Sequence, residues 1–374
     1  MIERYVECVE CKACVQICPK SCISFSNDGK IELEREKCIG CKLCERVCQV
    51  INNVKYNKSG DVYAAIGTNS QILNHSSSGG LARIFYEYIL DKGGVVFGVK
   101  YINNLEPVID YVESKEDLSA FLKSKYCFSN VGESYKRCRE FCVKGRMVLF
   151  IALPCQIAGL HLFLNRDYDN LITIDILCHG APQYIVFKNH IMYLEKKAKH
   201  KIVDYQFRDK DTDYYGPYHY KITYDNGKVQ VGSALWDAYY NAFLKSDIFR
   251  ESCYKCAFSC RERVADITLG DFWKAGDIIP ALKKEKYISS LIVNTGKGAK
   301  LLYACKDNIF LYKSNFRELE RSTHAVKNPA KRTTAVDVNE LKDNIKYYKW
   351  ASKYERSIRV FASKIKNIIL RRNT

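Results

Sequence analysis

The sequence predicts a mixed α/β or α+β fold in which a cysteine-rich module (residues 1–55) precedes a larger body (61–325) and a basic helical tail (338–374). Nine cysteines fall within the first 48 residues. In the body, near-continuous apolar segments alternate with helical patterns, which indicates parallel strands inside an α/β sheet. Later alternating segments indicate antiparallel strands. The hydrophobic content of 47% is sufficient for a buried core.

Eight of these cysteines form two runs with the same spacing, C-x2-C-x2-C-x3-C, and the ninth, Cys22, is expected to be a small buried structural residue. This spacing is typical of a module that holds two [4Fe-4S] clusters, because three thiolates come from one loop and the fourth from the other run. Paired zinc sites or disulfides are the alternatives, but a zinc site would not need the fourth cysteine of each run. The module resembles a bacterial-type ferredoxin. We therefore expect one cluster on Cys8, Cys11, Cys14 and Cys48, and another on Cys38, Cys41, Cys44 and Cys18.

Local patterns complete the module. Alternating residues on both sides of Asn27-Asp28-Gly29 predict a short hairpin over residues 23–33. Pro19 follows the first cysteine run, whereas Gln49 follows the second, a difference expected only to alter a turn. The polar residues 52–60 lack periodicity, which indicates a linker.

Four apolar segments of the body predict strands, over residues 62–67, 95–99, 147–152 and 171–177. Helical spacing follows at residues 81–89 and 156–164. The turn Asp225-Asn226-Gly227 predicts a hairpin over residues 218–231.

Four cysteines of the body could form a third metal site. Cys155 and Cys178 directly follow two predicted strands, so parallel pairing would place both at the carboxyl edge of the sheet, where α/β folds bind cofactors. Cys253 and Cys256 add a C-x2-C pair, which completes four ligands. Alternatively, Cys155 and Cys178 are small buried hydrophobic residues. Cys260 is a reserve ligand.

A nucleotide site is suggested by the small residues Ser77, Ser78, Gly79 and Gly80, which precede a predicted helix. Free backbone N–H groups at a helix N-terminus can bind a pyrophosphate, although such a run is more often a loop and a cap. Lys125 could add a cation, or it could lie at a solvated helix end. His179, beside Cys178, is either a proton relay or a packed histidine.

Taken together, the body resembles the family of coenzyme F420 hydrogenase/dehydrogenase beta subunits. The similarity is carried, in family order, by SSSGGLARIFYEYIL, KSKYCFSN, VLFIALPCQIAGL, ILCHGAP, FRDK and SCYKCAFSCRERVADITLGDFW. The resemblance implies FAD and a [4Fe-4S] cluster in the body, with Cys155, Cys178, Cys253 and Cys256 as ligands. It also implies that Ser77, Ser78, Gly79, Gly80 and Lys125 contact the flavin.

This resemblance implies an iron–sulfur flavoprotein oxidoreductase that passes electrons between ferredoxin-type clusters and FAD. The implied substrate takes or gives two electrons, and is either coenzyme F420 or an organic compound, as in relatives associated with polysaccharide biosynthesis. Ferredoxin or another carrier would be the partner. The alternative is a non-catalytic electron-transfer subunit of a larger hydrogenase or dehydrogenase.

Positive charge is concentrated at the C-terminus. The formal net charge is +17, and residues 321–374 hold 14 Lys and Arg against 4 Asp and Glu. Ile358, Phe361, Ile365 and Ile368 share one face of the predicted tail helix. Such a helix could pack on its own body, or it could bind an acidic electron carrier or an anionic membrane surface. Net charge alone supports nucleic-acid binding, which we do not expect.

The expected location is the cytoplasm, with the tail at the inner face of the membrane. The N-terminus lacks an apolar signal region, and no run approaches about 18 uncharged apolar residues. Abundant cysteine without a secretory signal favours metal ligands over disulfides.

Overall fold

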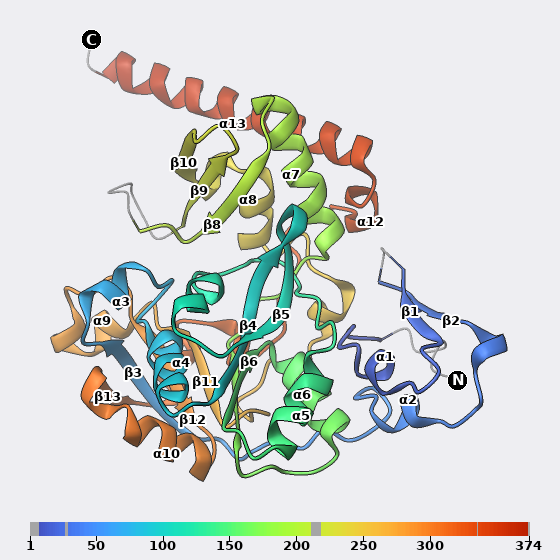
Figure 1. Ribbon diagram of the computed structural model, residues 1–374. Coiled ribbons are helices and arrows are strands. Elements are labelled where there is room, and N and C mark those ends of the chain that lie inside the picture. Colours follow the sequence, from blue (N-terminus) through green and yellow to red (C-terminus); the bar gives the residue numbers. More distant parts are fainter. Residues whose placement is uncertain (1–6, 27–28, 211–217, 335, 373–374) are drawn as a thin grey trace.

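The computed structural model describes residues 7–26, 29–210, 218–334 and 336–372, and side chains as far as residue 362. It contains three parts: the cysteine-rich module, a body on an eight-stranded sheet, and a second lobe around a three-stranded sheet (Figure 1). The predicted mixed α/β fold is confirmed. Residues 27 and 28 of the predicted hairpin turn, and the side chains of Ile365 and Ile368 in the tail, lie outside the described residues.

The module repeats one local design twice. Helices α1 (Ala13–Ile17) and α2 (Leu43–Arg46) each begin inside a cysteine run, after Lys12 and Lys42, whose φ angles of 56° and 59° are left-handed. This conformation turns the chain sharply between the second and third cysteines of each run. Strands β1 (Ile23–Phe25) and β2 (Ile31–Leu33) pair antiparallel, as the hairpin prediction required.

The main sheet has the strand order β13-β3-β12-β11-β7-β6-β4-β5. Its four central strands are parallel, whereas the strands on both sides pair antiparallel. The predicted parallel pairing of the strands before Cys155 and Cys178 is therefore confirmed. The strands are β3 (Asp61–Gly67), β4 (Val95–Ile102), β5 (Glu106–Val112), β6 (Val148–Ala152), β7 (Leu171–Ile176), β11 (Ile267–Asp271), β12 (Ser289–Val293) and β13 (Ile309–Ser314).

Helices cover both faces of this sheet. On one face, α4 (Leu81–Asp91) and α10 (Gly296–Ala304) pack over Val96, Leu149 and other inward residues. On the other face, α5 (Ser134–Val143) and α6 (Pro154–Leu164) share a core with Cys11 and further residues of the module. The module therefore docks on the α6 side of the body. The shorter helices are α3 (Ser70–Asn74), α9 (Ala275–Ile278) and α11 (Phe316–Glu320).

The second lobe has an aromatic core of its own, which includes Tyr205, Phe207 and Tyr239. The predicted hairpin at residues 218–231 is confirmed, but it belongs to this separate antiparallel sheet, with the order β10-β9-β8. The elements are α7 (Tyr184–Ala198), β8 (Ile202–Phe207), β9 (His219–Tyr224), β10 (Val229–Ser233), α8 (Ala238–Leu244), α12 (Val338–Leu341) and α13 (Asn344–Arg372).

Helix α13 begins in the second lobe and ends outside it. Tyr347 and Ala351 are completely buried in the aromatic core, whereas the C-terminal half of the helix projects beyond the lobe (Figure 1). Within the described residues, every helix is too short or too polar to cross a bilayer.

Candidate iron–sulfur and cofactor sites

The structure brings together the first set of four cysteines expected in the module, here called the first site. Cys8, Cys11, Cys14 and Cys48 line one small cavity of 20 Å³. Three of them come from the first run and one from the second, as the crossed ligand pattern requires. Burial, together with the neighbouring thiols, raises the pKa of the Cys8 thiol to about 12. Thiolates in such surroundings need a compensating cation, which a metal centre supplies.

The second set, Cys18, Cys38, Cys41 and Cys44, is here called the second site. Cys38 and Cys41 are exposed to solvent, whereas Cys18 and Cys44 pack against a small apolar cluster. Cys22 belongs to the same cluster, with its sulfur 3.4 Å from that of Cys18. Sequence reasoning treated Cys22 as a structural residue; its spacing outside the run gave no signal that a fifth thiol borders this site.

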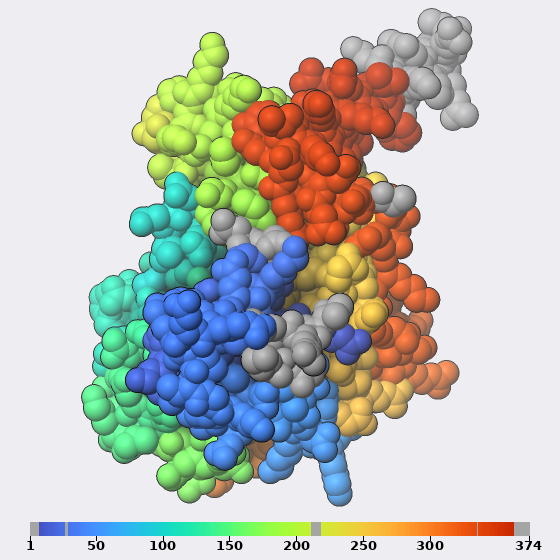
Figure 2. Space-filling view, turned by 90° about the vertical axis from the view of Figure 1, so that its right-hand side faces the viewer, coloured from blue at the N-terminus to red at the C-terminus, as the bar shows by residue number. Residues whose placement is uncertain are grey.

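The four cysteines of the body also come together, in what is here called the third site. Cys155 is at the start of α6, directly after β6, and Cys178 follows β7. Cys253 and Cys256 come from a loop that reaches the same edge of the sheet. All four line one cavity of 750 Å³, which residues of the module also line. Figure 2 shows the module lying against the segment around residue 250.

The four thiols of the third site line the same cavity. Burial, together with the neighbouring Cys253 and Cys256, raises the pKa of Cys178 to about 12. In the described chain, no three Cys, His, Asp or Glu side chains are gathered so as to hold a single metal ion. A cubane cluster makes a different demand, because its four cysteine ligands are distributed over four irons. The number and placement of the thiols fit such a cluster.

A buried cation lies beside the third site. The guanidinium of Arg250 is 3.4 Å from the ring centroid of Phe128 and 3.9 Å from the sulfur of Cys253. Burial would lower the pKa of Arg250, but the thiols and Glu10 raise it above its usual value. The guanidinium therefore stays charged, and it stabilises negative charge at this site.

Two hydrogen bonds connect the module to the third site. Gln49 Nε2 donates to the backbone oxygen of Cys155 at 2.8 Å, and Arg250 Nη1 donates to the backbone oxygen of Val9 at 2.7 Å. The expectation that Gln49 only alters a turn is wrong, because its amide crosses to the body. The sequence signal that could have predicted this contact was a side chain able to form hydrogen bonds at a position where proline was expected.

Arg263 organises the loop that carries Cys256. Its guanidinium donates to the backbone oxygen of Phe258 at 2.7 Å and to that of Cys260 at 3.3 Å. Cys260, the reserve ligand, directs its sulfur to the backbone oxygens of Ala257 and Glu262 in its own loop. The cavity of the third site is lined by Cys256 and not by Cys260.

The small residues predicted to bind a nucleotide form a tight loop before α4. Gly80 has a left-handed φ of 81°, which favours glycine. A side chain at Gly79 would lie 2.7 Å from the backbone oxygen of Ala65, and the Gly79 N–H donates to Ser289 Oγ at 2.9 Å. The glycines therefore let this loop lie directly against β3 and β12.

Two basic residues that sequence reasoning did not select border this loop. Arg208 Nη2 donates to the backbone oxygen of Ser77 at 2.9 Å, and Nη1 donates to Asp271 at 2.8 Å. Lys210 Nζ donates to the backbone oxygen of Ser78 at 3.0 Å. Both belong to the FRDK stretch at the end of β8. The sequence signal that could have identified them was a pair of basic residues directly after a strand.

The charges and rings around this loop suit an anionic aromatic ligand. Arg208 Nε is buried without a hydrogen-bond partner among the described residues. The Arg208 guanidinium lies 4.6 Å from the ring centroid of Trp273, and Lys210 Nζ lies 3.9 Å from that of Tyr287. Burial lowers the pKa of Lys210 to about 7, with contributions from Lys123 and Arg208. A bound phosphate would relieve this crowding of positive charge.

The structure places Lys125 differently from the other predicted flavin contacts. Its ammonium donates to the backbone oxygens of Ala120 and Leu122, at 3.0 and 2.7 Å. The preceding residue, Ser124, instead contacts Ser77, with 3.0 Å between the hydroxyl oxygens.

His179 lines the cavity of the third site. Its Nδ1 lies 2.8 Å from Nε2 of His324, and its Nε2 lies 3.2 Å from Ser246 Oγ. Burial lowers the pKa of His179 to about 4, with a further contribution from His324, so the imidazole is neutral at pH 7. The two rings form a hydrogen-bonded pair that begins beside Cys178.

The cysteine-rich module defines the class of the protein as an iron–sulfur protein. Residues 7–52 match the family model of the 4Fe-4S dicluster domain. Residues 145–318 match the family model for the C terminus of the coenzyme F420 hydrogenase/dehydrogenase beta subunit. The two matches support this family of beta subunits for residues 145–318, preceded by an N-terminal 4Fe-4S ferredoxin-type domain.

Two curated relatives are similar to part of the chain. A subunit of the F420H2 dehydrogenase of Methanosarcina mazei is 23% identical over 199 residues, which cover 50% of this chain and 57% of the relative. The coenzyme F420-dependent sulfite reductase of Methanocaldococcus jannaschii is 26% identical over 179 residues, which cover 47% of this chain and 28% of the relative. The match therefore spans 57% and 28% of these relatives' lengths.

A chain of the F420-reducing [NiFe] hydrogenase complex of Methanosarcina barkeri is a structural neighbour. The TM-score is 0.45 at 16% sequence identity, and the superposition covers 83% of this chain and 94% of the other.

Proposed function

We propose that this protein is an iron–sulfur flavoprotein oxidoreductase with three [4Fe-4S] clusters and FAD. The observation that carries the proposal is the 750 Å³ cavity in which four body cysteines meet the N-terminal module. Four converging thiols beside a ferredoxin module suit a cluster that receives electrons from that module. The first and second sites would each hold one further cluster.

The flavin would lie against the loop formed by Ser77, Ser78, Gly79 and Gly80. A bound flavin exchanges two electrons with a substrate, whereas iron–sulfur clusters take one at a time. Arg208 and Lys210 would bind its phosphates, and Trp273 would shield an aromatic ring from water. Asp271 orients Arg208 through their 2.8 Å contact. Lys125 donates to backbone oxygens and lies over the ring of Tyr101, so we propose that it supports the flavin site without contacting the phosphates.

The proposed substrate is coenzyme F420 or another organic compound that exchanges two electrons. Support comes from the names of the two relatives, both of which refer to F420. The proposed partner is a ferredoxin or another one-electron carrier, which would meet the exposed second site. The second candidate function is an electron-transfer subunit of a larger complex, and it is favoured because one relative is itself a subunit of a dehydrogenase.

Anaerobic assay of iron, acid-labile sulfide and extracted flavin in the full chain tests this proposal. About twelve irons and one FAD per chain would support three cubane clusters and a flavin. About eight irons without flavin would contradict the proposed flavoprotein oxidoreductase, and the electron-transfer subunit would remain as the candidate function. Reduction of F420 by the protein with its clusters and flavin bound would then identify F420 as the substrate, whereas no reduction would favour another organic compound.

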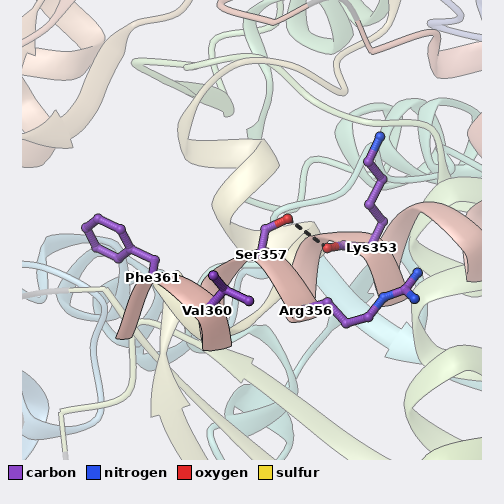
Figure 3. A pocket seen from close by; sticks show the side chains of 5 residues that line it. All are labelled: Lys353, Arg356, Ser357, Val360 and Phe361. Carbon is purple, nitrogen blue, oxygen red and sulfur yellow. Dashed lines mark hydrogen bonds between the residues drawn. The ribbon is translucent and has the colours of Figure 1, made fainter. Parts of the chain in front are cut away.

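We further propose that the projecting half of α13 binds an anionic membrane surface. Val360 and Phe361 are 56% and 61% exposed. They line a hollow of 420 Å³ with Lys353, Arg356 and Ser357 (Figure 3). Exposed apolar side chains beside basic ones suit the interface of a bilayer that contains acidic lipids.

A chain that ends at Glu355 tests this membrane contact. It retains the buried Tyr347 and Ala351, and the ion pair of Glu355 with Lys197 at 2.6 Å. We expect the full chain, but not the truncated one, to sediment with phosphatidylserine vesicles at low salt. Each basic residue should contribute about 1 kcal/mol. Equal sedimentation of the two chains, or equal binding to neutral vesicles, would contradict the proposal.

A further inference from the structure

Gln49 connects the first site with the third. It directly follows Cys48, a residue of the first site, and its side chain lines the cavities of both sites. Its Nε2 donates to the backbone oxygen of Cys155. The amide also contacts the Cys11 thiol, where it opposes the rise in pKa that burial causes. One side chain therefore contacts a cysteine of each site.

Arg250 makes the reciprocal connection from the body. It lies beside the sulfur of Cys253, and it donates to the backbone oxygen of Val9, the residue after Cys8. Its guanidinium is also 3.5 Å from the carboxylate of Glu10. Arg250 is 6% exposed, so these contacts are made largely out of water, where charge-assisted hydrogen bonds are strong.

The second site, unlike the first, lies on the solvent side of the module. Its residues Cys38 and Cys41 are exposed, as is Ile39 between them, at 61%. Cys11 of the first site lies in the core that the module shares with α5 and α6, whereas Cys44 of the second site packs against a cluster within the module. The module therefore presents the first site to the body and the second site to solvent.

We propose that Gln49 and Arg250 are positioning residues that hold the first site against the third, so that electrons cross between module and body at these two facing sites. This inference rests on the proposed function. In each crossing, one electron leaves the cluster of one site, which is oxidised, and enters the cluster of the other, which is reduced. No proton moves and no covalent bond forms or breaks. An external one-electron carrier exchanges electrons at the second site.

The test uses the full chain, reconstituted anaerobically and reduced with dithionite. The variants are Gln49→Ala and Arg250→Met. The matched controls are Gln71→Ala, an exposed glutamine of α3, and Arg46→Met, an exposed arginine of the module. Hydrogen exchange of residues 7–17 and 47–56 measures docking, and electron paramagnetic resonance measures magnetic coupling between reduced clusters. Iron content is measured for every sample.

We expect both variants, but neither control, to show faster exchange in these segments and weaker coupling. Slower electron transfer from module to body should follow, on the order of tenfold, as is typical when an outer-shell partner of a metal site is lost. If Arg250→Met loses iron, Gln49→Ala still decides the question. Unchanged exchange and coupling in Gln49→Ala would overturn the proposal.

The two proposals fail differently. A wild-type chain with about eight irons would contradict the third cluster, whereas the exchange of the module segments would still report whether Gln49 holds the module. Twelve irons with no effect of Gln49→Ala would contradict this inference and leave the proposed function intact.

Discussion

The guanidinium of Arg263 lies 3.3 Å from the carboxylate of Asp175, and both side chains are almost completely buried. Asp175 is on β7, in the centre of the sheet, whereas Arg263 ends the loop that carries Cys256. The ion pair therefore links the loop of the third site to the central strands of the main sheet.

Replacing Arg263 with methionine should destabilise the protein and empty the third site. Loss of one partner leaves a buried carboxylate without its cation, which costs roughly 3 to 5 kcal/mol. Denaturant unfolding and iron content would measure both effects. The control is Arg261→Met, because Arg261 pairs with Glu320 at the surface and should contribute at most about 1 kcal/mol. Equal losses in both variants would contradict this role of Arg263.

Cys178→Ser should lower the iron content by about four atoms per chain, because one cubane would lose a ligand. Cys260→Ser should leave the iron content unchanged, since the Cys260 sulfur contacts backbone oxygens of its own loop. Iron and sulfide analysis of the two purified variants would compare these residues. Iron loss from Cys260→Ser alone would make Cys260 the ligand in place of a predicted one.

Cys22 should replace Cys18 when that ligand is removed. The two sulfurs are 3.4 Å apart, so a small movement would bring Cys22 to the second site. Cys18→Ser should therefore retain more iron than the double variant Cys18→Ser/Cys22→Ser. Cys22→Ser alone is the control and should retain the full content. Identical iron contents in the single Cys18 variant and the double variant would exclude this substitution.

Flavin affinity should fall as the pH rises above 7. Burial, Lys123 and Arg208 lower the pKa of Lys210 to about 7, so its ammonium is charged below that pH and becomes neutral above it. Only the charged form attracts a phosphate, and binding should in turn raise this pKa. Fluorescence titration of the flavin-free protein with FAD, between about pH 6 and pH 8.5, would measure the dependence.

Lys210→Met should weaken FAD binding at pH 6 by roughly tenfold or more, because hydrogen bonds to charged groups contribute about 1.5 to 3 kcal/mol. Its affinity should also vary less with pH. Lys284→Met, at an exposed lysine nearby in the sequence, should behave as the wild type. A pH profile that Lys210→Met leaves unchanged would assign the dependence to another group.

The sequence by itself determined the local features of the protein. The spacing within each cysteine run predicts which thiols one tight loop can offer, because ligands three residues apart share a turn. Apolar periodicity likewise predicted β6 and β7, and with them the positions of Cys155 and Cys178 at one sheet edge. It did not predict β12 and β13, whose antiparallel pairing with β3 depends on distant segments.

Only the tertiary structure decided which distant residues meet. Gln49 and Cys155 are 106 residues apart, and Arg208 and Ser77 are 131 apart. No periodicity connects such pairs, because their approach depends on how the module docks and how the second lobe returns to the sheet. Spacing therefore indicates the ligands of each site, whereas long-range packing determines which sites face each other.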